Sequence, residues 1–552
     1  MISFSNFLVL LVSLSLFIIF LFKWVFKPAS TAGKRLPPSP PNLPVIGNLH
    51  QLGLYPHRAL QALSKRYGPL IMLHLGSVPA VVVSSADTAR EIMKTQDLIF
   101  SNRPKVSIAD KIVYGSKDIA FAPYGEHWRQ VRSICVLHLL SNKRVQSFRY
   151  IREEETDLLI QKIRQSSSSS TSVTNLSDLL VSLTNDTICR VAMGRKYSDG
   201  EAEGSTKFEL MLKEIMELSA TFNAGDFIPW LKWMNKVNGL DARVDKVAKS
   251  FDEFLSGVVE DHRNRKQGKT DRDDSSNDKD LVDLLLEIQR ENKSSFALDD
   301  EAIKGVIFDM FGAGTDTTYT SLEWTVAEVL KHPEIMKKLQ NEVRQVVGSK
   351  IEVEEEDLEK MPYLKAVMKE SLRLHPPIPM LVPRESTQDS KVMGYHIAAG
   401  TQVIINAWAI ARDPMQWENP EEFNPERFFK NSVVDFKGFN FEYIPFGAGR
   451  RGCPGITFAM AVNEFALAKL VRNFDFALPI GVKEWDMTEA VGSTSLHPLV
   501  PKIETSLPYL YHGARILCHD EGCPYWVIVH TSLGGASQNG EIVGYLQRGS
   551  DG

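Results

Sequence analysis

The sequence predicts a mainly helical protein with a small β region behind an N-terminal transmembrane anchor. Three observations support this prediction. Residues 2–22 are almost wholly apolar and uncharged, two short segments near residue 75 have the composition of strands, and helical periodicity extends from Asp299 to Lys331. The chain has 552 residues, of which 43% are hydrophobic and 24% charged, so it can build a large core.

The apolar run at residues 2–22 is long enough to span the roughly 30 Å hydrocarbon core of a bilayer. Basic residues follow it, from Lys23 to Arg35, whereas a cleaved signal peptide carries them before the run. We therefore predict a transmembrane signal anchor at residues 1–26, with the rest of the chain in the cytosol. Residues 27–48 are predicted to form a basic, proline-rich hinge, because five prolines lie between Pro37 and Pro44.

The next elements are short strands and amphipathic helices. Strands are predicted at Leu70–Leu75 and Ala80–Ser84, joined by the turn Gly76–Pro79. Helices are predicted at Ala86–Thr95, Thr206–Phe222 and Leu240–Glu260. The longest helix is predicted to begin at the aspartates Asp299 and Asp300 and to end ahead of Pro333.

Charge and cysteine content exclude some classes of protein. The formal net charge of −5 argues against a general nucleic-acid-binding protein. The five cysteines are odd in number and widely scattered, so they do not form a disulfide framework and suit a reducing compartment.

A single cysteine, Cys453, lies in the glycine-rich segment Phe446–Gly455, directly after two arginines. Small residues let the backbone close around a bulky planar group. Arginines beside a thiol favour its thiolate form, which is the form that binds metal. A lone thiolate in such a loop suits axial ligation of haem iron.

This segment allows three other interpretations. A lone cysteine is most often an inert core residue. A zinc site would need further Cys or His ligands at suitable spacing from Cys453, and none is present. Gly447-x-Gly449-x-x-Gly452 matches the dinucleotide-binding fingerprint, but Pro454 follows almost at once and no second βαβ half fits before the chain ends.

Small residues also interrupt the longest predicted helix, at Phe311–Thr318. Each glycine there costs about 1 kcal/mol relative to alanine, so a close approach or a local distortion is expected. Ala313 and Thr317 lie four residues apart and share a face. The hydroxyl of Thr317 beside the carboxylate of Asp316 can organise water and relay protons. A helix–helix contact made by small residues is the alternative.

Five motifs of this chain resemble those of the cytochromes P-450, in the expected order. Phe446–Gly455 matches the haem-binding signature Phe-x-x-Gly-x-Arg-x-Cys-x-Gly at every fixed position, and Ala313–Thr318 resembles the oxygen-activating helix. Glu370, Arg373 and Arg427 resemble the family's Glu–Arg–Arg structural lock. The resemblance covers roughly residues 36 to 500 and is specific to the plant microsomal A-type class of secondary metabolism.

The resemblance implies a triangular helical prism, with a haem domain at residues 49–503. It implies that Cys453 is the axial ligand of the haem iron and that Asp316 and Thr317 deliver protons. The residues that it implies contact the haem are Trp128, Arg132, Arg384, Arg451, Phe446 and Gly449. Trp128 and Arg132 share a helix face by their spacing. The residues expected to line the substrate pocket are Ile119, Phe121, Ala313, Ile378, Met380 and Leu381.

The implied reaction inserts one atom of O₂ into a small hydrophobic plant metabolite, such as a terpenoid or a phenolic. The cofactor is haem b, and electrons come from NADPH through NADPH–cytochrome P-450 reductase, with cytochrome b5 as an optional partner. The expected location is the endoplasmic reticulum membrane, with one membrane span and a cytosolic catalytic domain. Two alternatives stay open: dehydration or isomerisation on the same haem, and a haem protein made inactive by its altered C-terminus.

The C-terminal tail at residues 504–552 does not follow the family pattern. It carries no motif and no apolar periodicity, so it is predicted to be poorly ordered. Cys518, His519 and Cys523 would be a weak metal motif, and loose thiols are the simpler interpretation. A read-through, a splice product and a genuine extension all remain open.

Overall fold

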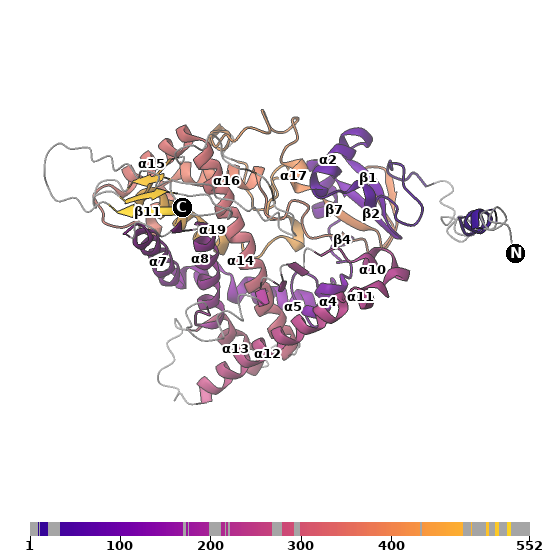
Figure 1. Cartoon of the computed structure of the whole chain (residues 1–552), viewed down its shortest axis with the longest axis horizontal. Helices are drawn as coiled ribbons and strands as arrows, with labels where there is room; N and C mark the ends of the chain where they lie inside the picture. Colours follow the sequence, from indigo (N-terminus) through magenta and orange to yellow (C-terminus); the bar gives the residue numbers. More distant parts are fainter. Residues whose placement is uncertain are drawn as a thin grey trace, which may run out of the picture.

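The protein is predominantly helical with a few small sheets (Figure 1), which confirms the predicted fold class. The computed structural model describes residues 34–168, 173–174, 176–197, 211–212, 214–215, 217–218, 221–267, 279–291, 298–430, 433–477, 487 and 489, the tail segments 504–506, 514–517 and 527–531, and residues 9 and 11–19 near the N-terminus.

The helices make up most of the domain. The α-helices are α2 (Pro56–Tyr67), α3 (Ala86–Arg90), α4 (Ser107–Ile112), α5 (Glu126–Ile134), α6 (Asn142–Ser147), α7 (Arg149–Ser168), α8 (Leu176–Met193), α10 (Ala224–Phe227), α11 (Met234–Val237), α12 (Leu240–Gln267), α13 (Leu281–Glu291), α14 (Asp300–Lys331), α15 (Pro333–Val347), α16 (Pro362–Leu374), α17 (Ala407–Ile410), α18 (Arg427–Lys430) and α19 (Ile456–Asn473). Short 3-10 or π-helical turns are η1 (Leu49–Gln51), η2 (Glu91–Thr95), η3 (Cys135–Leu139), η4 (Pro229–Leu231), η5 (Glu355–Lys360) and η6 (Gly449–Arg451).

The strands are β1 (Leu70–Leu75), β2 (Val78–Val83), β3 (Val173–Thr174), β4 (Arg384–Glu385), β5 (Ser390–Val392), β6 (Tyr395–Ile397), β7 (Gln402–Ile405), β8 (Asp475–Ala477), β9 (Glu504–Ser506), β10 (Ala514–Leu517) and β11 (Val527–Thr531). The largest sheet has the order β1-β2-β7-β4 and lies at one end of the domain (Figure 1). The antiparallel pair β1 and β2 continues in parallel into β7, so two distant parts of the chain complete this sheet.

The two strands predicted near residue 75 are present, but the second begins at Val78 rather than Ala80. The turn is therefore shorter than predicted. Pro79 pairs with His74 of β1, while the pairing of β2 with β7 begins only at Ala80, so the missing N–H of the proline removes no bond to β7. Gly76 has a φ of +62°, and a Cβ there would lie 2.4 Å from the carbonyl oxygen of Phe227.

Helix α14 passes through the middle of the domain and packs against α8, α16 and α19 (Figure 1). It begins as predicted, because the side chain of Asp299 accepts a hydrogen bond from the backbone N–H of Ala302 at 2.8 Å. It ends at Lys331, ahead of Pro333. Apolar residues of α14 contribute to both of the largest buried clusters, which is why this helix is apolar on most of its circumference.

Glu370, Arg373 and Arg427, the predicted lock, lie in contact. The carboxylate of Glu370 accepts hydrogen bonds from Arg373 at 2.8 and 2.9 Å and from Arg427 at 2.9 Å. Arg373 also donates to the carbonyl oxygens of Ala411, Pro420 and Glu422. The fully buried pair of Glu370 and Arg373, with the partly buried Arg427, therefore ties α16 to the segment that leads toward the cysteine loop.

Glu489 connects the last part of the domain to its first helix. Its carboxylate pairs with Arg58 of α2 at 3.0 Å and lies 3.3 Å from the ring of His57. Burial raises the pKa of this carboxyl, but the hydrogen bonds and charges of His57 and Arg58 outweigh that effect and lower it to about 2.

Several predictions fall wholly or partly outside the described residues. Of the predicted anchor, residues 9 and 11–19 are described, and they are helical and exposed. Within the described part of the chain, no helix combines the length and the apolar content that a membrane span requires. The predicted helix at 206–222 lies largely outside the description, and the helix predicted at 240–260 extends to Gln267.

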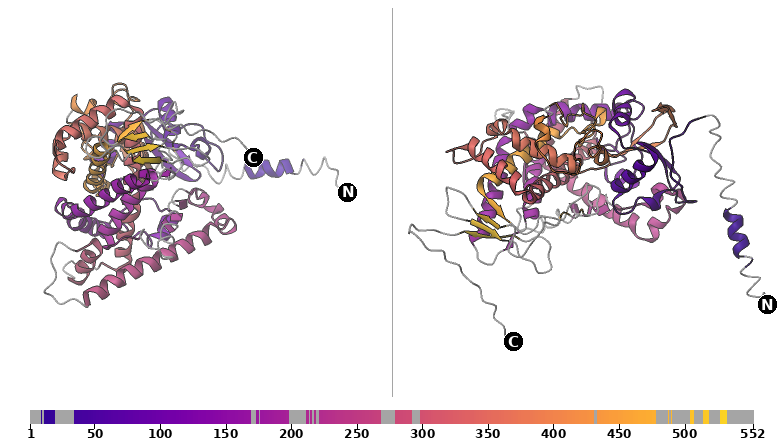
Figure 2. Two further views of the ribbon diagram at one scale, coloured as in Figure 1. Left: turned by 60° about the vertical axis from the view of Figure 1, so that its left-hand side comes forward. Right: turned by 90° about the horizontal axis from the view of Figure 1, so that it is seen from above.

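Three segments of the tail form the short strands β9, β10 and β11. β9 pairs with β8, and β11 pairs with β3 and packs against α7 (Figure 2). Strand pairing uses main-chain groups, which these segments offer without the apolar periodicity that the sequence prediction required. The rest of the tail, including Cys518, His519 and Cys523, lies outside the described residues.

The buried lock leads to a prediction about stability. Replacing Glu370 by Gln leaves the buried guanidinium of Arg373 without its counter-charge, so we expect the free energy of unfolding to fall by roughly 3–5 kcal/mol. Urea unfolding measures this change. The control is Glu253→Gln, which removes an exposed pair with Lys249 and should cost at most about 1 kcal/mol. Equal losses in the two variants would mean that the lock is worth no more than a surface pair.

Candidate active site

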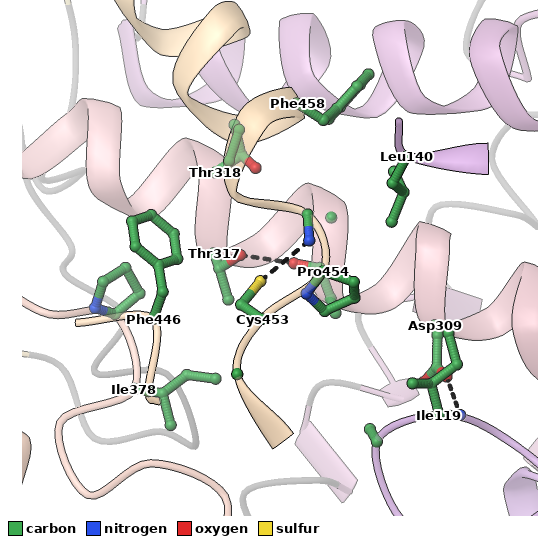
Figure 3. A pocket seen from close by; sticks show the side chains of 18 of the residues that line it. Ile119, Leu140, Asp309, Thr317, Thr318, Ile378, Phe446, Cys453, Pro454 and Phe458 are labelled. Carbon is green, nitrogen blue, oxygen red and sulfur yellow. Dashed lines mark hydrogen bonds between the residues drawn. The ribbon is translucent and has the colours of Figure 1, made fainter. Parts of the chain in front are cut away.

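A cavity of about 250 Å³ lies between α14, the cysteine loop and the segment that joins α16 to β4 (Figure 3). Its wall is mostly apolar. Four of the residues expected to line a substrate pocket, Ile119, Ala313, Ile378 and Leu381, do line it. Phe121 and Met380 are not among the described residues at its wall. Four of the six residues expected at the pocket therefore lie at this wall, although they come from distant parts of the chain.

Cys453 reaches the cavity from a tightly closed loop. The backbone N–H of Cys453 donates to the carbonyl of Phe446 at 2.9 Å, and Gly447 allows the closure with a φ of +69°. The N–H of Gly455 points at the sulfur, at 3.3 Å (Figure 3). Cys453 lines the cavity, and its exposed surface faces this space. The protein around the sulfur removes it from water, which raises the pKa of the thiol.

The groups that favour the thiolate of Cys453 differ from those that the sequence indicated. Burial raises the pKa of the thiol, while the N–H of Gly455 and the charge of Arg132 lower it. The adjacent arginines bind other groups: Arg450 pairs with Asp97 at 3.0 Å, and Arg451 donates to main-chain carbonyls. A residue more than 300 positions away therefore has the role that the sequence analysis gave to neighbours in the chain.

Gly449 is a glycine because the backbone of η2 packs directly against it, and not because a side chain there would enter the cavity. Its φ is +68°, and a Cβ there would lie 2.1 Å from the carbonyl oxygen of Met93 in η2. It is not among the described residues that line the cavity, whereas Phe446 is. The structure thus explains this glycine of the motif by the close approach of two turns of backbone.

Four arginines, which we call the guanidinium cluster, line one side of the cavity: Arg103, Arg132, Arg384 and Arg451. Main-chain carbonyls accept most of their hydrogen bonds. Arg132 donates to Gly452 at 2.6 Å, and Arg384 donates to Ala448 at 2.8 Å. Within the described part of the chain, only Arg384 has a carboxylate at ion-pair distance, that of Asp97 at 3.4 Å. The cluster therefore carries more positive charge than its immediate partners neutralise.

The electrostatics of the cluster indicate a binding site for an anion. Burial and the neighbouring guanidiniums lower the pKa of Arg384 to about 10, and that of Arg451 to about 9. Burial also lowers the pKa of Arg103, and the charges of Arg451 and Arg384 lower it further. A carboxylate ligand would relieve this repulsion through charge-assisted hydrogen bonds. The two propionates of haem b meet this requirement, and Cys453 offers a sulfur ligand in the same cavity.

Trp128 contacts the guanidinium cluster through Arg451. Its indole N–H donates to the carbonyl of Ile119 at 3.0 Å, and the guanidinium of Arg451 lies over its ring, 4.2 Å from the ring centroid. It is not among the described residues that line the cavity. Arg103 does line the cavity, although nothing in the sequence led us to expect it there. No motif surrounds Arg103 in the sequence, so only its place in the fold identifies it.

The small residues of α14 lie at the cavity wall and at a contact with a second helix. Ala313 and Thr317 line the cavity, and the hydroxyl of Thr317 donates to the carbonyl of Ala313 at 2.7 Å (Figure 3). Gly314 makes a helix–helix contact, because a Cβ there would lie 2.8 Å from a side-chain atom of Ile188 on α8. Asp316 is buried and is not among the described residues at the cavity wall.

Comparisons with known proteins identify the family. A model of the family described as Cytochrome P450 matches residues 37–504. Norfluorocurarine oxidase of a Strychnos species is 57% identical over 496 residues, which are 89% of this chain and 96% of that protein. (+)-Menthofuran synthase of Mentha piperita is 52% identical over 484 residues, which are 87% of this chain and 95% of that protein.

Solved structures agree with the sequence comparisons. A zebrafish cytochrome P450 determined with abiraterone has a TM-score of 0.69 at 27% identity, and the alignment covers 87% of this chain and 100% of that one. The family match extends over nearly the whole described domain, and the relatives resemble this chain over almost their full length. With the sulfur ligand and the anion site in one cavity, these findings place the chain in the cytochrome P450 family of haem-thiolate monooxygenases.

Proposed function

We propose that this enzyme inserts one oxygen atom from O₂ into a small hydrophobic plant metabolite of the terpenoid or phenolic class, with electrons from NADPH delivered by cytochrome P450 reductase. The cavity carries this proposal, because it brings the sulfur of Cys453 and the hydroxyl of Thr317 together inside an apolar wall. Away from the guanidinium cluster the wall of this cavity of about 250 Å³ is mostly apolar, which suits a small apolar ligand. Relatives named for (+)-menthofuran and for norfluorocurarine support a small organic substrate.

Bound haem supplies the oxygen-activating redox chemistry of the family. The chain contributes the sulfur of Cys453, whose charged form is favoured by the N–H of Gly455 and by Arg132. The guanidinium groups of Arg103, Arg384 and Arg451 would donate hydrogen bonds to the two propionate carboxylates of the haem. The apolar wall excludes bulk water from the same space.

Thr317 is placed to control a proton. Its hydroxyl hydrogen is directed to the carbonyl of Ala313, at 2.7 Å, so the hydroxyl oxygen keeps its acceptor lone pairs. Since Thr317 lines the cavity, this oxygen can order a proton-donating water beside the reacting group. Asp316 precedes it and is buried, and in this proposal its carboxyl would supply protons to the water at Thr317.

We further propose that residues 1–26 anchor the enzyme in the endoplasmic reticulum membrane as a single span, with the catalytic domain in the cytosol. The uncharged apolar run and the basic residues after it support this location. On that side of the membrane the reductase, and cytochrome b5 as a second donor, would reach the domain.

The function is tested by turnover. The enzyme, reductase and NADPH are combined in lipid with a panel of plant terpenoids and phenolics, and NADPH consumption is measured together with the mass of the product. Oxygen insertion consumes NADPH and adds one oxygen atom. Product without NADPH consumption would indicate dehydration or isomerisation instead. Normal haem binding without any turnover on a broad panel would favour the inactive alternative.

The sulfur ligand has a direct spectroscopic test. Cys453→Ser is expected to abolish the thiolate-type spectrum of the ferrous–CO complex, because the hydroxyl is not ionised at neutral pH and replaces the sulfur at the cavity. Cys189→Ala is the control, since it removes a buried thiol of α8 that does not line the cavity. A normal thiolate spectrum in Cys453→Ser would contradict the assignment.

The role of Thr317 is tested by coupling. Thr317→Ala is expected to lower product formation on the order of 10²-fold and to divert electrons to hydrogen peroxide, because the ordered proton donor is lost. The matched control is Thr325→Ala, since Thr325 makes the same bond to the carbonyl four residues before it, at 2.7 Å, but does not line the cavity. Equal coupling in both variants would assign Thr317 a packing role only.

The anchor is tested by deletion. Removal of residues 2–26 is expected to release the protein from carbonate-washed membranes, because this run supplies the length needed to span the bilayer. The haem spectrum of the deleted protein is the control, and it should be unchanged because the cavity residues all follow residue 90. Retention of the deleted protein in washed membranes would contradict the proposed anchor.

A further inference from the structure

The loop Asp118–Ala122 lies between α14 and the guanidinium cluster and contacts both. It runs close along α14 at Gly305, where a Cβ would lie 3.4 Å from the backbone of Asp118. One helical turn further on, the side chain of Asp309 reaches the same loop (Figure 3). Asp309 lines the cavity and is only 7% exposed.

The N–H groups of the loop are held by two carboxyls. Asp309 accepts from the N–H of Ile119 at 2.5 Å and also from the N–H of Ala120. Asp118 accepts from the N–H of Phe121 at 3.0 Å. The N–H groups of these three successive residues therefore find their acceptors in this pair of side chains. None of the three residues belongs to a helix or a strand that could supply other acceptors.

The carbonyl groups of the same loop hold the site residues on its other side. The carbonyl of Ile119 accepts from Trp128 at 3.0 Å and from Arg451 at 3.2 Å. The carbonyl of Ala120 accepts from Arg103 at 2.9 Å. The peptide groups of Ile119 and Ala120 thus form a direct hydrogen-bonded connection from α14 to two members of the guanidinium cluster.

A side-chain hydrogen bond joins Asp309 and Asp118, and it raises the pKa of Asp309 while it lowers that of Asp118. Oδ1 of Asp118 is buried and has no donor among the described residues. Burial and the charge of Asp118 raise the pKa of Asp309 well above its usual range, and burial raises that of Asp118 to about 6. Arg103 faces Asp118 and favours its charged form, and the buried thiol of Cys135 on η3 faces Asp309.

We propose that Asp309 is a positioning residue, which as a neutral acid fixes through one loop both the wall of the substrate cavity at Ile119 and the guanidiniums of Arg451 and Arg103. The hydrogen bonds that carry this role do not depend on the identity of the substrate. This proposal rests on the proposed function in one respect: it takes the guanidinium cluster to be the site that binds the haem propionates.

The test compares two replacements of Asp309 in the full-length holoenzyme. Asparagine keeps an oxygen that accepts from the loop and an N–H₂ that donates to Asp118, whereas leucine keeps neither. Asp309→Leu leaves buried N–H groups unpaired, so we expect haem transfer to apomyoglobin to be faster by roughly tenfold or more. Asp309→Asn should stay within about threefold of the wild-type rate, which is under 1 kcal/mol.

Glu323→Gln is the matched control, because Glu323 is also a buried carboxyl of α14 with a raised pKa, of about 8, but bonds to Ser177 away from the cavity. It should leave haem transfer unchanged. If Asp309→Leu transfers haem no faster than this control, or if Asp309→Asn is as impaired as Asp309→Leu, the proposal is wrong. Haem transfer needs no substrate, so its outcome is independent of whether oxygen insertion is the reaction.

A pH profile keeps the test decisive if Asp309→Leu does not fold. The proton of Asp309 stabilises the loop and is lost as the pH rises through the raised pKa of Asp309, so haem transfer from the wild type should accelerate as the pH rises through that range. Asp309→Asn has no such proton and should give a flatter profile. Asp118→Asn removes the charge that helps to raise this pKa, so the acceleration should begin at lower pH. Identical profiles for all three proteins would overturn the proposal.

Discussion

The arrangement of the site depends on clustered positive charge that the protein holds with main-chain carbonyls. Arg103, Arg132, Arg384 and Arg451 line one side of the cavity, and burial, together with the charges of neighbouring guanidiniums, lowers the pKa values of Arg103 and Arg451. The carbonyls that hold them belong to the segments near residues 101–122, 382–383 and 448–452. The cluster can therefore form only when these distant parts of the chain have converged, and it is satisfied fully only by an anionic ligand.

Helix α14 organises this convergence along a single stripe. Gly305, Asp309, Ala313 and Thr317 are spaced four residues apart, so they follow one another along one face. The first two meet the loop Asp118–Ala122, and the last two face the cavity. Because one rigid helix carries both contacts, the position of the loop and that of the Thr317 hydroxyl are linked.

Two ionic connections keep the rest of the domain in place around this helix. The fully buried carboxylate of Glu370 joins α16 to the segment before the cysteine loop. Glu489 joins the end of the domain to α2. Neither connection touches the cavity, so both act by restricting how the elements that carry the site can move relative to one another.

The sequence alone was sufficient to predict the elements whose signals come from neighbouring residues. It predicted the strands near residue 75, the long helix from Asp300 to Lys331 and the cysteine loop, because alternation, helical period and glycine spacing are properties of neighbouring residues. Tertiary structure decided which groups act on that loop. Arg132 rather than Arg450 or Arg451 favours the thiolate of Cys453, Gly449 is explained by Met93, and Arg103 and Asp309 join the site without any motif. These contacts link residues hundreds of positions apart, and the strength of a charge interaction depends on distance and burial in the folded protein, which a linear pattern does not contain.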